Sequence, residues 1–327
     1  VLGLLSPEDI LTCGVSCAFL RDVSSKDTLW KQICARDYGF LQPVAPPGRD
    51  GNLPSCRLAW VSWKRSFIRY DAGLVRRMYL WWETVESWLL NSMPDILWTL
   101  APGVDDAALD SVERRLGGVP LPPAVRLLYR FHNGQRLTVD NFVRREGGGV
   151  VASASRGLFG GHSFYGRCAC MKFHSLARLE QTTRTLVRRE WAQRLPPPER
   201  RQLATAVAFA SGLDYGAAYV AGADGRVFIA ANNVFLRCVS DLDTAPGVDP
   251  GNVAASDEER RTLLPWLDEY ARRLTSGCYA VRPLWPSVAL CETLLSLFPE
   301  TAAEGCSERV THGVRVRVSA LFCPMAA

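Results

Sequence analysis

The chain has 327 residues, about twice the length of a usual domain, so we expect two or three domains. Hydrophobic residues make up 48% of it, and 38 basic and 33 acidic side chains nearly balance to a net charge of +5, which excludes a largely disordered protein. The basic residues are spread along the chain, so nucleic acid is not an expected partner. No run of 18 apolar residues occurs, and a membrane is not an expected partner either.

Eleven cysteines are scattered from Cys13 to Cys323. Their number is odd, no signal peptide precedes them, and a chain of this size does not need disulfides to hold its core together. We therefore interpret them as reduced thiols and expect a cytoplasmic or nuclear protein.

Short helices are predicted for the first 38 residues. Apolar side chains recur there near helical spacing, residues 6–9 are a helix-start signal, and residues 29–33 carry a second apolar face. A loop rich in proline and glycine follows at residues 42–54, and helix resumes near Cys56. The pattern indicates a small helical module followed by a linker.

A longer helix is predicted from Leu74, because its apolar residues step at intervals of three or four and form one buried stripe. The stripe consists of Val75, Met78, Trp82, Val85 and Leu89. Another helix is predicted from about Asp105 to Gly117, and a third from Pro122 until the pair Asn133-Gly134 ends it with left-handed backbone.

The second half of the chain predicts a sheet with one more helix. An apolar run at residues 203–210 and a hairpin around the turn 222–225 indicate strands, and residues 257–274 indicate a helix that stops at Gly277. Three valines alternate with polar residues at 314–318, which predicts a half-buried strand. Helix and strand together indicate an α+β domain and the start of a further β unit.

No catalytic constellation stands out. Cys168, Cys170 and His174 bring soft ligands close together but lack the second ligand pair that structural zinc usually has. The glycine-rich residues 157–166 match no phosphate-binding motif, and no nucleophile elbow is present. We therefore expect no catalytic residue, metal or cofactor, and protein binding as the default function. A metal enzyme using the two cysteines and His174 is a remaining alternative.

Residues 4–11, 15–17 and 24–34 resemble an F-box, and the V-S-C at 15–17 and the closing Leu29-Trp30 carry the resemblance. The resemblance implies helices that dock on the Skp adaptor of a cullin–RING ubiquitin ligase. The chain opens at Val1, inside the motif, so we expect an N-terminally incomplete F-box. The Skp contacts that the resemblance implies are Leu5, Pro7, Ile10, Leu11, Val15, Ser16, Leu29 and Trp30.

Residues 121–135, with the sequence LPPAVRLLYRFHNGQ, resemble the signature of the SUKH superfamily, and residues 157–162, GLFGGH, follow at the expected distance. We expect a target protein to contact the loops 136–149 and 157–166, because irregular loops on a rigid scaffold commonly carry recognition. Loops that serve packing alone are the alternative. The candidate target contacts are Asn133, Gly134, Gln135, Gly160, Gly161 and His162.

Residues 310–318, VTHGVRVRV, are similar to the opening strand of an ApaG β-sandwich. The chain thus resembles F-box proteins that carry F-box, SUKH and ApaG domains in that order, most closely their plant members. The expected fold is multidomain α+β. The expected domains are an F-box at 1–41, a linker and helix at 42–70, a SUKH domain at 71–280, a linker at 281–309 and the start of an ApaG domain at 310–327.

The resemblance implies a substrate-recognition subunit of an SCF (Skp–cullin–F-box) ubiquitin ligase. Its partners would be the Skp adaptor, through it a cullin and a RING protein, and an unidentified target held by the SUKH and ApaG part. The chain itself would not be an enzyme. The alternative is a SUKH scaffold that binds proteins without any ligase and whose N-terminal helices are only structural. Binding to Skp separates the two.

Overall fold

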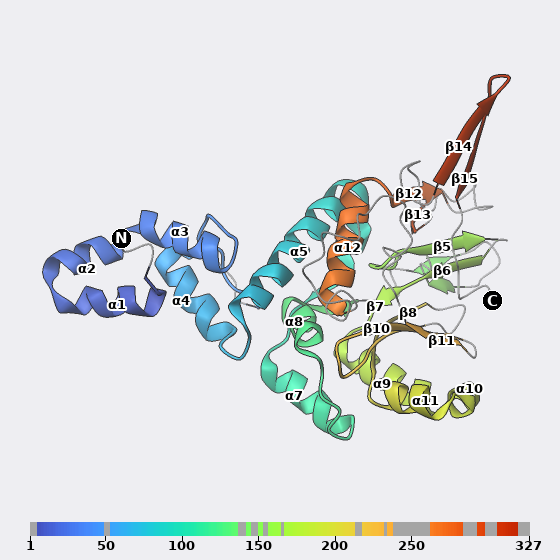
Figure 1. The fold of residues 1–327 in the computed structure, drawn as a ribbon, viewed down its shortest axis with the longest axis horizontal. Coiled ribbons are helices and arrows are strands. Elements are labelled where there is room, and N and C mark those ends of the chain that lie inside the picture. The colour runs from blue at the N-terminus through green and yellow to red at the C-terminus, as the bar shows by residue number, and fades with distance from the viewer. Residues whose placement is uncertain are drawn as a thin grey trace, which may run out of the picture. The chain divides into compact units, whose positions relative to one another are not determined.

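The computed structural model describes residues 5–48, 53–136, 142–144, 150–152, 156–164, 167–212, 218–231, 234–237, 262–283, 293–297 and 306–319 (Figure 1). The chain divides into two units, Val1–Glu83 and Thr84–Ala327. The expected mixture of helix and strand is confirmed.

The first unit is helical, as predicted. It contains α1 (Pro7–Ser16), α2 (Ala18–Ser25), α3 (Asp27–Asp37), α4 (Cys56–Ser66) and the first part of α5 (Ala72–Ser92). The predicted start at Ser6 is confirmed, since its hydroxyl accepts the backbone N–H of Asp9 and caps α1. Ser55 caps α4 in the same way through the N–H of Leu58, so helix resumes where the sequence predicts it.

Aromatic side chains form the core of this unit. The Trp63 ring lies 5.2–5.4 Å, between centroids, from the rings of Tyr38, Phe40, Phe67 and Tyr79, and its indole N–H donates to the carbonyl of Val44. The carbonyl belongs to the predicted linker after residue 41, so Trp63 fastens that segment to α4. The tryptophans of this unit are all buried and serve its packing: Trp30, Trp60, Trp63, Trp81 and Trp82.

The second unit begins with helices and a short sheet. After α6 (Pro94–Thr99) come β1 (Leu100–Pro102), α7 (Asp106–Arg115), α8 (Pro123–Phe131) and β2 (His132–Gln135), which pairs antiparallel with β1. The predicted end of α8 at Asn133-Gly134 is wrong, because the helix ends at Phe131 and the next four residues are a strand. Gly134 does have a positive φ of 70°, but inside β2.

A five-stranded sheet is ordered β11–β10–β9–β8–β7. Its strands are β7 (Lys172–Phe173), β8 (Val207–Ser211), β9 (Ala218–Ala221), β10 (Val227–Ala231) and β11 (Val234–Arg237). The predicted hairpin is confirmed as β9 and β10, with Gly225 at φ 77° in its turn. The predicted strand from residue 203 is only partly correct, since residues 203 and 204 end a helix and β8 begins at Val207.

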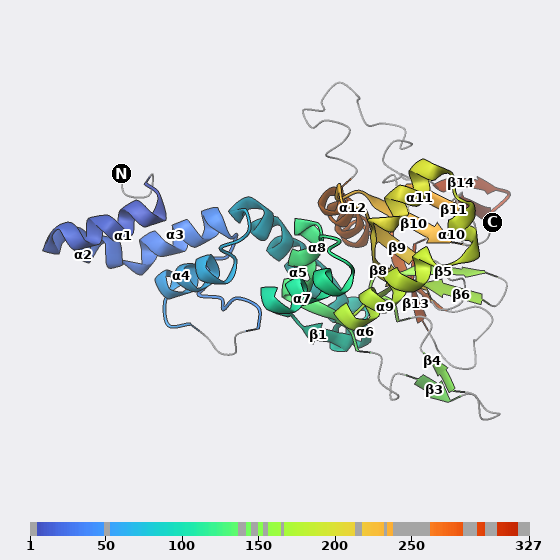
Figure 2. The ribbon, with the colours of Figure 1, turned by 90° about the horizontal axis from the view of Figure 1, so that it is seen from below.

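Helices cover both faces of this sheet. Three helices that the sequence did not predict, α9 (Leu176–Val187), α10 (Glu190–Arg194) and α11 (Pro197–Ala204), lie over one face (Figure 2). Their residues Leu186 and Leu203 join Ala208 and Val220 of the sheet in one buried cluster. The predicted helix α12 (Leu263–Thr275) serves the other face, where its Trp266 contacts Phe209 and Tyr219. Successive residues of β8 and β9 therefore point alternately toward α9 to α11 and toward α12.

A second sheet has the order β12–β13–β5–β6. Its strands are β5 (Gly161–Phe164), β6 (Arg167–Cys170), β12 (Ala280–Pro283) and β13 (Thr293–Ser296). The sheet draws together distant segments, because β13 runs parallel to β5, pairing Ser296 with Gly161. The segment 281–309, expected as a linker, therefore contains strands of the same sheet as β5 and β6.

Two isolated hairpins complete the described strands. One is β3 (Phe142–Arg144) with β4 (Val150–Ala152), and the other is β14 (Cys306–Thr311) with β15 (Val314–Ser319). The predicted strand at 314–318 is confirmed as β15, but the predicted half burial is wrong, because the three valines of β15 are all exposed. Among the helices that the structure describes, none is both long and apolar enough to cross a bilayer.

We expect Trp63→Ala to lower the free energy of unfolding by about 3 to 5 kcal/mol, because it opens a cavity among four aromatic rings and leaves the carbonyl of Val44 without its donor. Trp98→Ala is the matched control, since Trp98 is 76% exposed, and should change that free energy by at most about 0.5 kcal/mol. Urea unfolding followed by circular dichroism measures both. Equal effects of the two changes would contradict the role given to Trp63.

Candidate functional site

The eight residues implied as Skp contacts fall into two groups in the structure. Pro7, Ile10 and Trp30 are buried, with Trp30 wholly inaccessible and its indole N–H donating to the carbonyl of Ser24 at 2.7 Å. The other five reach the surface to differing degrees. Leu5, Leu11 and Leu29 are half-buried, whereas Val15 and Ser16 are exposed.

The buried members hold the helical module together. Trp30 on α3 packs against Trp60 of α4, with ring centroids 5.7 Å apart. Ile10 occupies the buried side of α1, and α1 and α2 lie against each other as a hairpin. These two side chains therefore help to fix the positions of the helices.

Two exposed apolar side chains lie near the junction of α1 and α2, and only one of them was an expected Skp contact. Val15 near the end of α1 is 75% exposed, and Phe19 near the start of α2 is 72% exposed. Phe19 was not among the expected contacts. The backbone is extended at Cys17, which separates α1 from α2, and both side chains are exposed on either side of this junction.

The candidate target contact Gln135 is a structural centre in the second unit. Its side chain is 6% exposed. The carbonyl oxygen accepts the backbone N–H groups of Leu158 and Phe173 at 3.0 and 3.1 Å. The amide nitrogen donates to the Thr99 hydroxyl and the Arg156 carbonyl at 2.8 and 2.9 Å. All four hydrogen-bonding positions of the side chain are thus used within the fold, and none remains for a target.

The neighbours of Gln135 in its motif also serve packing. The side-chain oxygen of Asn133 accepts the N–H of Leu176 at 2.9 Å and so satisfies a free donor at the start of α9. At Gly134, a Cβ would lie 2.2 Å from the carbonyl carbon of His174, so only glycine fits. The structure thus uses these residues within the fold, and a target contact at them stays a prediction.

The glycines of the second stretch are interior residues as well. Gly160 and Gly161 are buried, Gly160 has a φ of 62°, and a Cβ on it would lie 2.7 Å from the side chain of Leu297. Gly161 pairs with Cys170 on β6 and with Ser296 on β13. The His162 side chain lies outside the described residues, as do most of the loop residues 136–149. Close strand packing accounts for both glycines.

Phe159 explains why this stretch is apolar. Its ring lies 5.5–6.3 Å, between centroids, from the rings of Phe173, Phe209, Tyr219, Trp266 and Tyr270. These rings come from β7, β8, β9 and α12, so one side chain joins the sheet to the helix that covers it. The hydroxyl of Tyr270 also donates to the carbonyl of Leu158.

The residues of the metal alternative do not form a site among the described side chains. Nδ1 of His174 lies 3.1 Å from the carbonyl of Ala208, which only accepts, so Nδ1 carries the proton. Nε2 then accepts the Ser211 hydroxyl at 2.7 Å, which leaves neither nitrogen free for a metal. Within the described part of the chain, no three histidine, cysteine or acidic side chains gather as ligands. The Cys168 side chain lies outside it.

Burial also suppresses the reactivity of the described interior thiols. It raises the pKa of Cys34 to about 12 and that of Cys170 to about 11. The thiolate is the nucleophilic form, so these two thiols are inert at neutral pH. Burial has the opposite effect on the cationic form of an imidazole, and it lowers the pKa of His174 to about 4.

No protein-family model matches the chain. Among curated proteins it is 30% identical to the F-box protein SKIP16 of Arabidopsis thaliana, in an alignment that covers 99% of this chain and 68% of the relative. It is 27% identical to the F-box only protein 3 of Homo sapiens and 26% identical to that of Rattus norvegicus. Each of these alignments spans 143 residues, 44% of this chain and 29% or 28% of the relative.

We expect Gln135→Leu to lower the free energy of unfolding by at least about 2 kcal/mol, because it leaves two buried backbone N–H groups without an acceptor. Gln193→Leu is the matched control, since Gln193 is exposed and makes one bond to the carbonyl of Val187. Chemical unfolding of both variants tests this. A Gln135→Leu protein as stable as the control would show that the four bonds do not hold the segments together.

The protein should lose stability as the pH falls below 6.5, because the unfolded chain protonates His174 while the folded chain keeps it neutral until about pH 4. The expected loss is up to about 2 kcal/mol between pH 6.5 and 5. The free energy of unfolding is measured at both pH values for the wild type and for His174→Gln, whose side chain does not titrate. Equal pH dependence of the two proteins would contradict the assignment to His174.

Proposed function

The chain belongs to the F-box protein family, and on that premise we propose that it is a substrate-recognition subunit of an SCF-type ubiquitin ligase. In this role the helical unit binds the Skp adaptor and, through it, a cullin and a RING protein. The second unit, which we propose to be a SUKH domain followed by the start of an ApaG domain, holds the target. The chain contributes proximity and orientation, and the thioester chemistry belongs to its partners.

The exposed pair at the α1–α2 junction is the observation that carries the Skp part of this proposal. Val15 and Phe19 are both more than 70% exposed, while Ile10, on the same helix as Val15, is buried. Burial of two such side chains by a partner removes apolar surface from water, which favours association. Amphipathic helices commonly bind partners by placing apolar residues in a groove.

The half-buried Leu5, Leu11 and Leu29 extend the proposed contact, and the exposed Ser16 lies beside Val15. Pro7, Ile10 and Trp30 have a supporting role in this proposal, because they form the core on which the contact residues rest. A change at Trp30 would therefore test folding rather than binding. The surface residues are the informative ones.

We expect Val15→Asp and Phe19→Asp each to weaken binding to a purified Skp adaptor at least about thirtyfold, because each places a charge where an apolar contact forms. Ile68→Asp is the matched control. Ile68 is an apolar residue of the same unit, is 72% exposed and lies in the segment after α4, so binding should persist. Calorimetric titration of the full chain with Skp gives the affinities.

The Skp result separates the ligase subunit from the alternative, a protein-binding scaffold outside any ligase. Retained thermal unfolding in both variants, together with lost binding, supports the ligase role. If the wild-type chain fails to bind Skp, or if Ile68→Asp loses affinity as much as Val15→Asp does, the proposed contact is wrong.

A further inference from the structure

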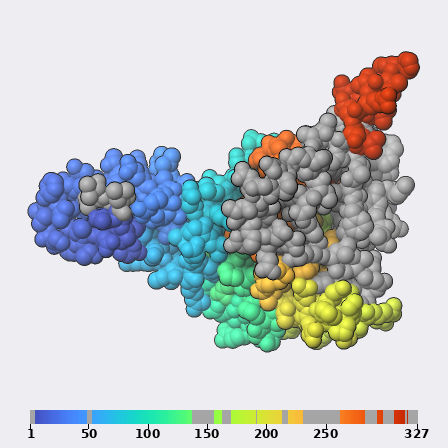
Figure 3. All heavy atoms as spheres, in the orientation of Figure 1, coloured from blue at the N-terminus to red at the C-terminus, as the bar shows by residue number. Residues whose placement is uncertain are grey.

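The outward face of α4 carries basic and apolar side chains together. The helix belongs to the first unit, whose surface is drawn in blue in Figure 3. One side of α4 is buried in the aromatic core, and the opposite side is exposed around the half-buried Val61. Residues three and four positions from Val61 share its face, and all four of them are exposed. They are Arg57, Leu58, Lys64 and Arg65.

Two apolar side chains of this region are open to solvent. Leu58 on α4 is 50% exposed, and Ile68, two residues after the helix, is 72% exposed. Leu58, Val61 and Ile68 follow one another at intervals of three and seven residues, which is the spacing of one helical side. We call these three residues and the basic residues around Val61 the α4 surface. Exposed apolar residues with a polar rim are typical of a protein contact.

The basic residues of the α4 surface have no acidic residue between them. Residues 51–70 contain four basic residues and no acidic one. Lys64 pairs with Glu8 of α1 at 3.1 Å, whereas no carboxylate among the described residues pairs with Arg57 or Arg65. A guanidinium carries five donors in a planar fork that suits a carboxylate. The two arginines therefore offer unused donors to an acidic partner.

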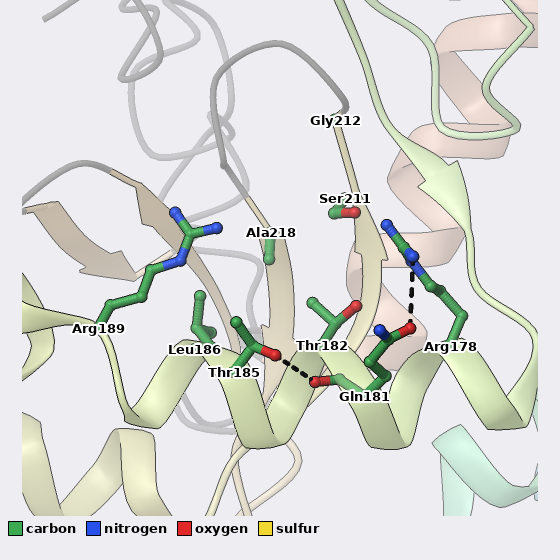
Figure 4. Close-up of a pocket in the computed structure, with 9 residues that line it drawn as sticks. All are labelled: Arg178, Gln181, Thr182, Thr185, Leu186, Arg189, Ser211, Gly212 and Ala218. Carbon is green, nitrogen blue, oxygen red and sulfur yellow. Dashed lines mark hydrogen bonds between the residues drawn. The ribbon is translucent and has the colours of Figure 1, made fainter. Parts of the chain in front are cut away.

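An arginine-rich surface of the second unit lacks this apolar component. A hollow of about 230 Å³ lies between α9 and the strands β8 and β9, and Arg178 and Arg189 are among its lining residues (Figure 4). None of the lining residues is one of the exposed large apolar side chains of the described chain. Positive charge and exposed apolar area are thus combined at the α4 surface but not in this hollow.

The combination favours one class of anionic partner. A nucleic-acid backbone pairs with arginines but leaves Leu58 and Ile68 without an apolar contact. A lipid surface binds a helix through the apolar side chains that the helix inserts, and the tryptophans of α4 are buried in the core instead. A protein helix with a row of apolar residues between acidic ones covers both components, because rows three and four residues apart interlock between two helices.

We propose that the α4 surface binds an amphipathic acidic helix of a partner protein. Apolar residues of that helix contact Leu58, Val61 and Ile68. Carboxylates that flank its apolar row accept hydrogen bonds from Arg57 and Arg65. The α4 surface shares no residue with the proposed Skp contacts, so it is a second binding surface of the first unit.

Fluorescence anisotropy of the full chain with three labelled peptides of about 18 residues, roughly five helical turns, tests the proposal. The first peptide is an amphipathic helix with a leucine row flanked by glutamates. The second has glutamine in place of each glutamate, and the third has alanine in place of each leucine. We expect the first peptide to bind at least about tenfold more tightly than either of the others, because it alone supplies both components. Equal affinity of the first and third peptides would overturn the apolar part of the contact.

Arg57→Gln and Arg65→Gln should each weaken binding of the first peptide about fivefold or more, because each removes a charge-assisted contact. Arg188→Gln is the matched control, since Arg188 is an exposed arginine of the second unit and its loss changes the net charge equally. All three variants should unfold at the wild-type temperature, because the three side chains are exposed. Equal loss of affinity in all three would show that net charge alone attracts the peptide and would overturn the proposal.

Two competitors distinguish the other anionic partners. A single-stranded oligonucleotide that displaces the first peptide at equal concentration would overturn the proposal in favour of nucleic acid. Vesicles of phosphatidylserine and phosphatidylcholine that displace it at equal lipid concentration would overturn the proposal in favour of a membrane.

Skp binding is measured in the same preparations. Ile68→Asp is expected to weaken binding of the first peptide at least about tenfold and to bind Skp like the wild type. Val15→Asp is expected to show the reverse. Loss of both partners in either variant would contradict two separate surfaces. A chain that binds the first peptide but not Skp would contradict the ligase role alone, and one that binds Skp without preferring the first peptide would contradict the α4 assignment alone.

Discussion

A single buried amide fixes the centre of the second unit. Gln135 has no solvent to satisfy its polar atoms, so each of its four hydrogen bonds must be made to a neighbouring segment, and those segments have only one mutual arrangement that provides them. Its partners belong to the end of α6, the turn before β5 and the strand β7. The aromatic rings around Phe159 and the close approach of Gly134 to the backbone of His174 lie directly beside these bonds. Both depend on the same alignment of segments.

The residues that the family resemblance singled out have different physical roles in the structure. A residue of a family motif can be required by the fold, by a partner or by both. Its burial in the structure distinguishes the first requirement from the second. Trp30 and Gln135 are interior residues whose loss would disturb the shape of the surface. Val15 and Phe19 are surface residues that owe their position to that interior. The interruption of the helix at Cys17, beside the exposed Phe19, cannot be recognised from the spacing of apolar residues.

Local patterns predicted the elements that local forces determine. The α5 stripe, the helix stop at Gly277 and the β9–β10 hairpin follow from periodicity and from glycine geometry. The pairing of β13 with β5 joins residues more than a hundred positions apart, and nothing in either segment encodes its partner. The helices α9 to α11 were missed because their arginine-rich exposed face masks the few apolar residues, such as Leu186 and Leu203, that pack on the sheet.

The scarcity of lysine in the second unit has a chemical consequence. Lys26, Lys31 and Lys64 all lie in the first unit, and the fourth lysine, Lys172, is buried. Amine-directed acylation therefore has accessible side-chain targets only in the helical unit. Guanidinium groups also keep their charge at every physiological pH. The arginine-rich surface of α9 to α11 therefore stays positively charged, because neither a change of pH nor the acylation of amines removes the charge of a guanidinium group.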